Sequence, residues 1–578
     1  MKRFVTILSL VFVTISLMTG CAAKRYFIGY VTHSNMVTML DVATNKIIDN
    51  IYVGQNPAWI QTAPDGRHLW VTKVGDFRTS VIDGWTAEII KTMPMRRVVF
   101  RHQSPNYYIV SSDGVYEIDA SNDTAIVTQI SAQLPDAWHA VLTADDRWLY
   151  VNHTFMGWMY PPGTLRRDYD YITLVDLKEK EIVKQIKVGK NPYDIKLTPN
   201  GRYIITANKT TNDISIVDTR TNEMTKSVPV GQVARCIAIR PDGKQMAVSC
   251  DGTPEGSKRR NGEIYLFKTN FSDTLIVKLQ KKIVVGGFPE FGSYTPDGKK
   301  LYFIERDKNE AVLINPSALR ITKRISLQGR PGSGMEIAFT EVTKEVRNSL
   351  MQTEKPTRKL LKEIIKNMKA QNPYIYDLKI TERFERFDPE TGEFKEQHAQ
   401  KIYFKHPDLM KIETKGMKVF LFNRGVPENV RPRMPMITQR YILWAMHGMS
   451  IDEVIKYLAG AFTDIKINPR SIAVDLIHSE KEGENDYYVI GAVEGVRNVS
   501  QLWVDKSTWL PYRLIEAFPQ QGIVRELRFM EYKKVENKFM FPFLVEVYIN
   551  GKLVNKEKVI EAKPNSGLSE RDFALPQK

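Results

Sequence analysis

The sequence predicts a mainly β protein: a seven-bladed β-propeller followed by an α+β domain with a curved antiparallel half-barrel sheet and covering helices. Three observations lead to this fold class. A turn signal recurs along the first half of the chain, a short apolar strand follows each turn, and helical spacing replaces this rhythm after Phe339. Four-stranded propeller blades repeat at about 40–45 residues, which matches the interval between most of the turns.

The repeated unit is a run of short apolar strands bounded by polar turns. The turns contain Pro, Asp, Asn and Gly, at Pro64-Asp65-Gly66, Pro105-Asn106, Asp145-Asp146, Pro199-Asn200-Gly201, Pro241-Asp242-Gly243 and Pro296-Asp297-Gly298. Such runs form antiparallel meanders, and meanders repeated around an axis form a propeller. Tyr26–Tyr30 has no partner before it and Met335–Phe339 has none after it, so we expect these strands to pair and close the ring.

The segment YVTHSNMVTMLDVATNKIIDNIYVGQNPAWIQTAPDGRHLWVT resembles the YVTN-type β-propeller repeat of bacterial and archaeal surface proteins. The resemblance covers about residues 26–340 and implies a propeller over residues 21–340. It is specific for the fold and says little about function.

Two enlarged loops interrupt the repeat, at 152–171 and 251–263, and the topology places both on the face that carries the Val-Gly loops. Their aromatic and arginine side chains predict a partner-binding rim, because these residue types are enriched at interfaces. The rim residues are Trp158, Tyr160, Arg166, Arg167, Arg259 and Arg260. The alternative is that both loops are only solvated.

Titratable residues follow several Val-Gly loops and are expected at the mouth of the central channel. A hydrolase resembling the propeller lactonases would hold a divalent ion there, with Asp136, His139, Asp194, Glu290 and Glu336 as the candidates. Arg97 and Arg235 lie among them and argue against a tight cation site. Without a Ser-His-Asp order, a phosphate loop or an HExxH motif, we expect a non-enzymatic protein with no cofactor and no resident metal.

Helical spacing predicts linking helices over 341–370, and strands then dominate residues 371–578, including one at Ser471–Ile477. Ser450 and Glu453 form a capping box that opens a further helix. The segment LWVDKSTWLPYRLIEAF resembles the strand-turn-strand of the LolA and LolB lipoprotein carriers, with Trp509 where that family usually has Gly.

The resemblance to the carrier family implies a curved antiparallel sheet, covered by helices, with an apolar cavity for acyl chains. The expected lining residues are Tyr376, Leu378, Ile402, Phe404, Leu421, Trp503, Leu514, Phe529 and Phe543. An ordinary filled core gives the same periodicity and remains open as the alternative.

The N-terminus predicts an exported, lipid-anchored protein. Lys2 and Arg3 precede an apolar run too short to span a bilayer comfortably, and the run ends in Leu17-Met18-Thr19-Gly20-Cys21, which looks like a lipobox. Cleavage would remove residues 1–20 and leave Cys21 to carry the acyl chains. Ala22 is not the aspartate that retains lipoproteins at an inner membrane, so we expect an outer-membrane lipoprotein facing the periplasm.

The net charge is 82 − 66 = +16, which suits anionic lipid headgroups or acidic glycans. No nucleic-acid-binding signature is present. Cys236 and Cys250 flank a turn and are either a cross-strand disulfide or two buried thiols.

The predicted function is that of an envelope protein that binds lipid or lipoprotein acyl chains and recognises an envelope partner through its propeller. The rival predictions are a non-catalytic interaction scaffold and a propeller hydrolase.

Overall fold

The structure is a computed structural model. It describes residues 24–75, 78–94, 98–121, 126–155, 165, 167–254, 261–327, 336–352, 355–371, 377–405, 409–414, 417–423, 426–427, 450–459, 472–518, 521–536 and 539–569. None of the helices in these ranges is long and apolar enough to cross a membrane.

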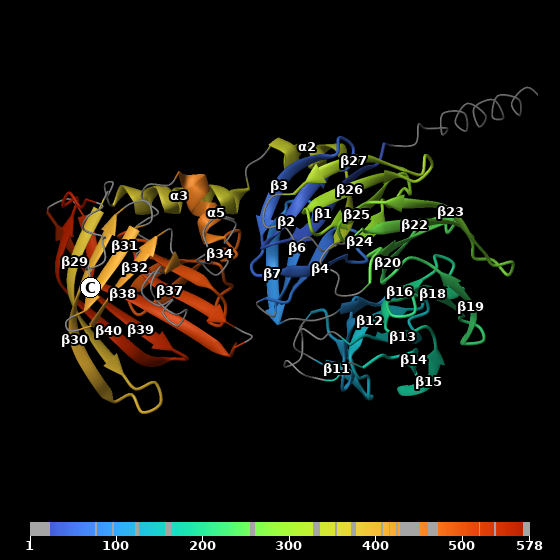
Figure 1. Ribbon diagram of the computed structural model, residues 1–578, viewed down its shortest axis with the longest axis horizontal. Coiled ribbons are helices and arrows are strands. Elements are labelled where there is room, and N and C mark those ends of the chain that lie inside the picture. The colour runs from blue at the N-terminus through green and yellow to red at the C-terminus, as the bar shows by residue number, and fades with distance from the viewer. Residues whose placement is uncertain are drawn as a thin grey trace, which may run out of the picture.

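Seven four-stranded antiparallel sheets form the N-terminal ring (Figure 1). Blade 1 contains β28 (Ile337–Val342), β1 (Tyr26–His33), β2 (Met36–Asp41) and β3 (Lys46–Tyr52), from the inside outwards. Blade 2 contains β4 (Pro57–Thr62), β5 (His68–Lys73), β6 (Arg78–Asp83) and β7 (Glu88–Pro94). Blade 3 contains β8 (Val98–Phe100), β9 (Tyr107–Ser111), β10 (Gly114–Ile118) and β11 (Ile126–Ser131).

The remaining blades follow the same order. Blade 4 contains β12 (Ala137–Leu142), β13 (Trp148–His153), β14 (Tyr171–Asp176) and β15 (Glu181–Lys187). Blade 5 contains β16 (Pro192–Leu197), β17 (Tyr203–Asn208), β18 (Asp213–Asp218) and β19 (Glu223–Pro229). Blade 6 contains β20 (Ala234–Ile239), β21 (Gln245–Cys250), β22 (Glu263–Asn270) and β23 (Ile276–Val284). Blade 7 contains β24 (Pro289–Tyr294), β25 (Leu301–Glu305), β26 (Glu310–Asn315) and β27 (Arg320–Ser326).

The ring closes as the sequence predicts. β1 pairs with β28 from Tyr26↔Val342 to Val31↔Ile337, and it pairs with β2 on its other side. Closure removes the long exposed edges that an open array of sheets would present. The seven-bladed β-propeller is therefore confirmed.

Cation–carboxylate pairs join neighbouring strands within the blades. Arg67 Nε donates to Asp83 at 2.9 Å, and the Arg147 guanidinium pairs with Asp176 at 2.8 Å in the same position of blade 4. In blade 1 the corresponding carboxylate, Asp41, receives two bonds of 2.8 and 2.7 Å from Arg347. Arg347 belongs to α2 (Lys344–Gln352), so this pair ties the first helix after the ring to blade 1.

The two cysteines of blade 6 are buried free thiols. Cys250 lies opposite Ala234, and the register shifts between Ala234 and Ile237, so Cys236 does not face Cys250 across the ladder. Cys236 packs in the core between blades 6 and 7, whereas Cys250 packs in the core between blades 5 and 6. The disulfide alternative is wrong for this reason.

The C-terminal part is a twelve-stranded antiparallel sheet with α3 (Pro356–Ala370) and α5 (Ile451–Leu458) on one face (Figure 1). The strands in sheet order are β33 (Val426–Pro427), β32 (Met417–Asn423), β31 (Leu409–Thr414), β30 (Phe394–Lys405), β29 (Asp377–Phe387), β40 (Lys552–Pro564), β39 (Phe539–Ile549), β38 (Ile523–Val535), β37 (Pro511–Phe518), β36 (Gln501–Asp505), β35 (Asn485–Ile490) and β34 (Ile477–Glu482). This confirms a large antiparallel sheet after the propeller.

Local details of this part match the sequence at one helix and differ at one strand. The capping box at α5 is confirmed, because Ser450 N donates to Glu453 Oε2 at 2.6 Å and Glu453 N donates to Ser450 Oγ at 3.2 Å. The strand expected at Ser471–Ile477 is wrong, because residues 472–476 form an irregular turn with Val474 N bonded to the Ile472 carbonyl. Asp475 in this turn contacts the propeller.

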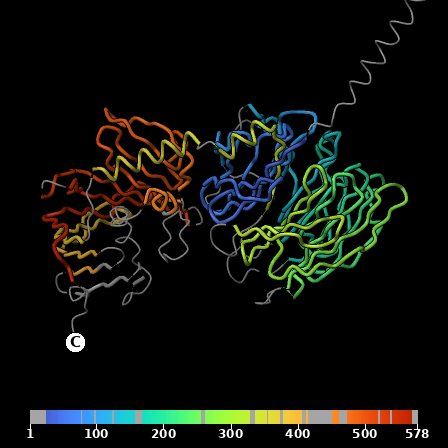
Figure 2. The backbone as a smooth tube through the Cα atoms, turned by 90° about the horizontal axis from the view of Figure 1, so that it is seen from above, coloured from blue at the N-terminus to red at the C-terminus, as the bar shows by residue number. Residues whose placement is uncertain are grey.

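The C-terminal domain docks on the face of blades 1 and 2 that carries the Val-Gly loops (Figure 2). Arg358 of α3 bonds Asp475 at 2.9 and 2.7 Å, and it also donates to the Asn50 carbonyl at 3.2 Å. Asp475 in turn accepts the Tyr52 N–H at 2.6 Å. Met36 and Tyr52 complete the contact by joining the apolar core beneath the two helices.

Candidate functional site

The main apolar feature of the C-terminal domain is the helix-bearing face of its sheet. Alternate residues of each strand point to this face, because side chains alternate across a strand. On β39 they are the odd-numbered residues from Phe539 to Val547, all apolar. The face therefore arises from a period-two pattern that runs across many strands.

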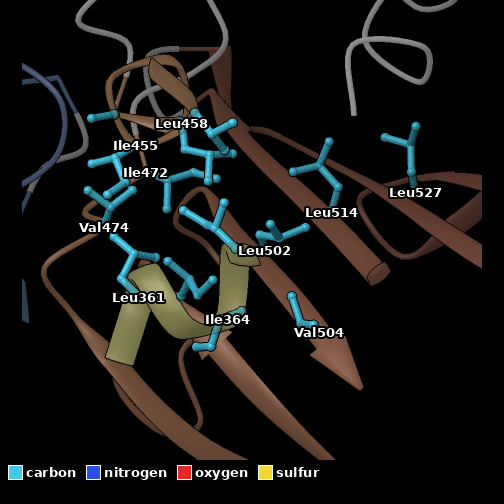
Figure 3. Close-up of a cluster of buried hydrophobic side chains, with 14 of the residues drawn as sticks. Leu361, Ile364, Ile455, Leu458, Ile472, Val474, Leu502, Val504, Leu514 and Leu527 are labelled. Atoms are coloured by element: carbon cyan, nitrogen blue, oxygen red, sulfur yellow. The ribbon is translucent and has the colours of Figure 1, made fainter. Parts of the chain in front are cut away.

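One part of this face is covered by helices, and we call it the helix-covered cluster (Figure 3). Leu361 and Ile364 of α3 and Ile455 and Leu458 of α5 pack there, each 4% exposed or less. Their partners on the strands include Leu502, Val504, Leu514, Leu527, Phe529, Val545 and Val547. The helices bury this half of the face as an ordinary packed core.

A second part of the same face continues beyond these helices, and we call it the distal cluster. It consists of Leu378, Ile380, Ile402, Phe404, Ile412, Phe539, Phe541, Val559 and Ala562, with Phe543, Tyr532 and Val535 packed against it. Tyr532 also packs on the helix-covered cluster, so the two clusters are continuous. Within the described ranges, no helical residue belongs to the distal cluster.

The predicted acyl-cavity residues divide among three places. Leu514 and Phe529 lie in the helix-covered cluster. Leu378, Ile402, Phe404 and Phe543 lie in or against the distal cluster. Tyr376 and the side chain of Leu421 fall outside the described residues.

Trp503 does not lie on this face, and its assignment to the cavity is wrong. On β36, Leu502 and Val504 point to the helices, so Trp503 between them points to the opposite face. There it is fully buried between the guanidinium groups of Arg497 and Arg513, at 4.5 and 4.6 Å from its ring. The apolar character of Trp503 alone did not show which face of the sheet its side chain points to.

The predicted partner-binding rim is described only at Arg167. Its guanidinium lies 3.7 Å from the Asp136 carboxylate, which also accepts a bond of 2.6 Å from the Tyr169 hydroxyl. The other rim residues, Trp158, Tyr160, Arg166, Arg259 and Arg260, lie outside the described residues, as does Cys21. The docked C-terminal domain occupies the same face at blades 1 and 2, which sequence reasoning did not anticipate.

The candidate metal ligands of the channel are distributed over separate pairs. Glu290 accepts a bond of 2.8 Å from Tyr193 and lies 3.3 Å from Arg306. Asp194 lies 3.4 Å from Lys196 and 3.5 Å from His139. The described part of the chain contains no group of three or more His, Cys, Asp or Glu residues arranged to hold a metal.

Asp194 is buried and ionised. Burial by itself would raise the pKa of this carboxyl group, but Lys196, His139 and the Ile237 N–H outweigh burial and hold its pKa below the usual range. Burial likewise opposes the charge on Lys196, yet Asp194 and Glu336 keep the pKa of its ammonium group raised. The channel therefore contains ionised acidic and basic side chains whose charges compensate each other.

A cavity of about 270 Å³ lies beside these charges, lined by strands of blades 2, 3, 4 and 5 and by Glu336 next to blade 1. Trp59, Trp70 and Trp138 line it together with Val98, Val99, Val110, Ala137, Ala140, Val141 and Ile195. Its polar lining consists of Gln61, Thr72, His139, Lys196 and Glu336. Sequence reasoning placed His139 and Glu336 at the channel but missed Trp138 and Lys196, since a repeat pattern does not show which blades leave space between them.

Comparison with known proteins gives a limited result. Residues 164–238 match the family described as the cytochrome D1 heme domain, a match that covers blade 5 and parts of blades 4 and 6. No curated protein matches the chain. The match is too short to assign the chain to that family.

Similar solved structures resemble one part of the chain at low identity. A protein of unknown function from Desulfotomaculum acetoxidans is 13% identical, with 54% of this chain and 98% of that chain covered and a TM-score of 0.44. A protein provisionally named 6-phosphogluconolactonase from Bacteroides fragilis is 14% identical, with 55% and 99% covered and a TM-score of 0.43. Hydrazine synthase from Kuenenia stuttgartiensis is 15% identical, with 50% and 96% covered and a TM-score of 0.39. These likenesses carry no argument beyond the fold that the strand order already defines.

The residues present do not fit the haem that the matched family's description mentions. The matched segment contains no histidine, and His139, outside it, rests against Asp194 at 3.5 Å. The channel cavity of about 270 Å³ is smaller than the roughly 300–1,000 Å³ of sites for drug-sized ligands, and a tetrapyrrole is at least that large. We therefore derive no haem chemistry for this chain.

Proposed function

We propose that this chain is a lipid-anchored envelope protein that binds an acyl chain of a lipid or lipoprotein on the distal cluster. The observation that carries the proposal is the extension of one apolar sheet face beyond the two helices that cover its other half. The propeller serves as the partner-recognition part through the blades of its docking face that the C-terminal domain leaves open.

The distal cluster has the chemistry that an acyl chain needs. Its nine residues are all apolar, and each is at most 8% exposed. Burial of a methylene group contributes about 0.8 kcal/mol, so ten buried methylenes would contribute about 8 kcal/mol before the entropic costs of binding. Because micromolar affinity corresponds to about 8 kcal/mol net, a chain must bury more than ten methylenes to reach it.

The N-terminal motif and the charge support the envelope part of the proposal. Cys21 stands at the end of an apolar run of signal-peptide length, and several acyl chains on one cysteine anchor a protein stably. The net charge of +16 favours a surface of anionic headgroups. In cells, Cys21→Ser should move the protein from the detergent phase to the aqueous phase in a phase-partition assay. Unchanged partition would remove the anchor from the proposal.

The acyl site is tested by native mass spectrometry and lipid extraction of the chain from residue 22 onwards. Neighbouring residues of β40 supply matched variants: Val559 lies in the distal cluster, whereas Ile560, at a register shift in the ladder with β29, is 57% exposed. We expect a bound fatty acid or phospholipid in the wild type and in Ile560→Gln, and a loss of at least tenfold in Val559→Gln.

The opposite results have clear meanings. A wild-type protein without lipid would indicate that the face is filled by the chain itself and would favour a scaffold that binds only protein partners. Equal lipid content in both variants, with near-UV circular dichroism unchanged, would place the lipid elsewhere.

A further inference from the structure

The cavity in the propeller channel is not used by the lipid proposal. About 270 Å³ is enclosed by three tryptophans, a group of small aliphatic residues and five polar side chains. Small-molecule sites typically combine an apolar and aromatic wall with a few convergent polar groups. The volume limits the ligand to one smaller than a drug-sized molecule.

The charges in the wall select an uncharged ligand. Lys196 lies 3.4 Å from the Asp194 carboxylate, and Glu336 on the inner side of blade 1 adds a second carboxylate to its field. An anion in the cavity would meet the Glu336 carboxylate, and a cation would meet the Lys196 ammonium group, since both side chains line it. Because the opposite charges already compensate each other, either kind of ion would lose hydration without gaining net attraction.

The same wall disfavours a purely apolar ligand. Gln61, Thr72 and His139 face the cavity beside the two charged groups, and an apolar molecule would remove water from all of them without replacing its hydrogen bonds. A ligand rich in hydroxyl groups can donate to carboxylates and accept from ammonium or amide groups. The C–H faces of its ring pack on indole faces, whose π-systems are electron-rich.

We propose that the cavity binds one uncharged monosaccharide ring, packed against the tryptophans Trp59, Trp70 and Trp138 with its hydroxyl groups toward Lys196 and Glu336. The edge-to-face contact of Trp59 and Trp138, with ring centroids 5.3 Å apart and an interplanar angle of 81°, gives these two walls a fixed geometry before binding. Such a site is independent of the C-terminal sheet.

The test uses sugar rings that differ in charge. The chain from residue 22 onwards is titrated with D-glucose, D-galactose and N-acetyl-D-glucosamine as neutral probes, and with D-glucosamine and D-glucuronate as charged probes, by calorimetry and tryptophan fluorescence. We expect saturable binding of at least one neutral probe, at least tenfold tighter than that of either charged probe. Failure of all three neutral probes to saturate, or tighter binding of a charged probe, would overturn the proposal.

Two variants locate the site. Ala140→Leu extends a side chain into the cavity and should weaken the neutral probe at least tenfold, whereas the exposed Ala318→Leu in the turn between β26 and β27 should leave it unchanged. Glu336→Gln keeps the shape and removes one charge, so binding of D-glucuronate should strengthen relative to the neutral probe. Wild-type behaviour of both Ala140→Leu and Glu336→Gln would refute the placement. Lipid content should not change in Ala140→Leu, which separates failure of this site from failure of the acyl site.

Discussion

The Arg358–Asp475 pair of the C-terminal domain should contribute most to docking, because its two members bond the Asn50 carbonyl and the Tyr52 N–H of the propeller. The side chains are 15% and 2% exposed, and the guanidinium makes bonds of 2.9 and 2.7 Å to the carboxylate. The Arg358→Met variant would leave the buried Asp475 carboxylate without its guanidinium partner, while the Tyr52 N–H of the propeller still donates to it at 2.6 Å. Breaking a buried pair from one side costs about 3–5 kcal/mol, and we expect a loss of that size.

The assay is calorimetric and urea-induced unfolding followed by far-UV and near-UV circular dichroism. Weakened docking should separate a single transition into two, one for each domain, because the propeller and the sheet each keep their own core. The double variant Arg358→Met/Asp475→Leu should recover part of the loss, since it removes the buried charge together with its partner.

A matched pair on the surface provides the control. Arg25 and Glu341 form the same kind of bidentate ion pair, but their side chains are 52% and 45% exposed. Arg25→Met should leave the unfolding transition unchanged within error, because solvent screens exposed pairs. If Arg358→Met also costs less than about 1 kcal/mol, the reasoning from burial is refuted.

Three further outcomes follow from local geometry. Trp509 has a φ of 58° and stacks on Tyr488 at 5.6 Å, so Trp509→Gly should be more stable than Trp509→Ala by about 1 kcal/mol in chemical denaturation, since both lose the stack but only Gly relieves the backbone strain. Burial lowers the pKa of His33 to about 3, so as the pH falls the imidazole is protonated in the unfolded chain before it is protonated in the folded one. The free energy of unfolding should therefore fall by about 1.4 kcal/mol per pH unit from pH 6.5 towards 3. His33→Gln should remove that slope from the pH dependence of the unfolding free energy. Burial opposes ionisation of Asp83, but Arg67 outweighs burial and holds the pKa of this carboxyl group low. The stabilisation that ionised Asp83 gives the fold is therefore present above about pH 3.9 and is lost as the pH falls through the depressed pKa. An unchanged acid-unfolding curve in Asp83→Asn would contradict this.

The propeller was predictable because the turns and strands of each blade are specified by residues close together in the sequence. Turns such as Pro199-Asn200-Gly201 and strands that end in Asp218 repeat the same unit, and neighbouring strands pair in sequence order. Closure by Tyr26–His33 was predictable from the one strand left over at each end. The capping box of α5 was equally local.

The predictions that were wrong or missing concern which face of a strand a residue points to and which distant residues it contacts. Trp503 is apolar and aromatic, yet a shift of one residue along β36 places it on the face opposite Leu514. The separation of Cys236 from Cys250 depends on a register shift in one ladder. Neither is visible in composition, because a strand has two faces and the sequence does not state which one is covered.

The sequence by itself determined the ring of seven blades, the large apolar-faced sheet that follows it, and the expectation of a lipid anchor at Cys21. Only the tertiary structure decided that Asp475, in an irregular turn, bonds Arg358 and the Tyr52 N–H to dock the two domains. It also decided that Lys196 and Trp138 share a cavity with Glu336 from another blade. The physical reason is that hydrophobic periodicity and turn chemistry act over a few residues, whereas the pairing of buried charges and the space between blades depend on residues that are hundreds of positions apart.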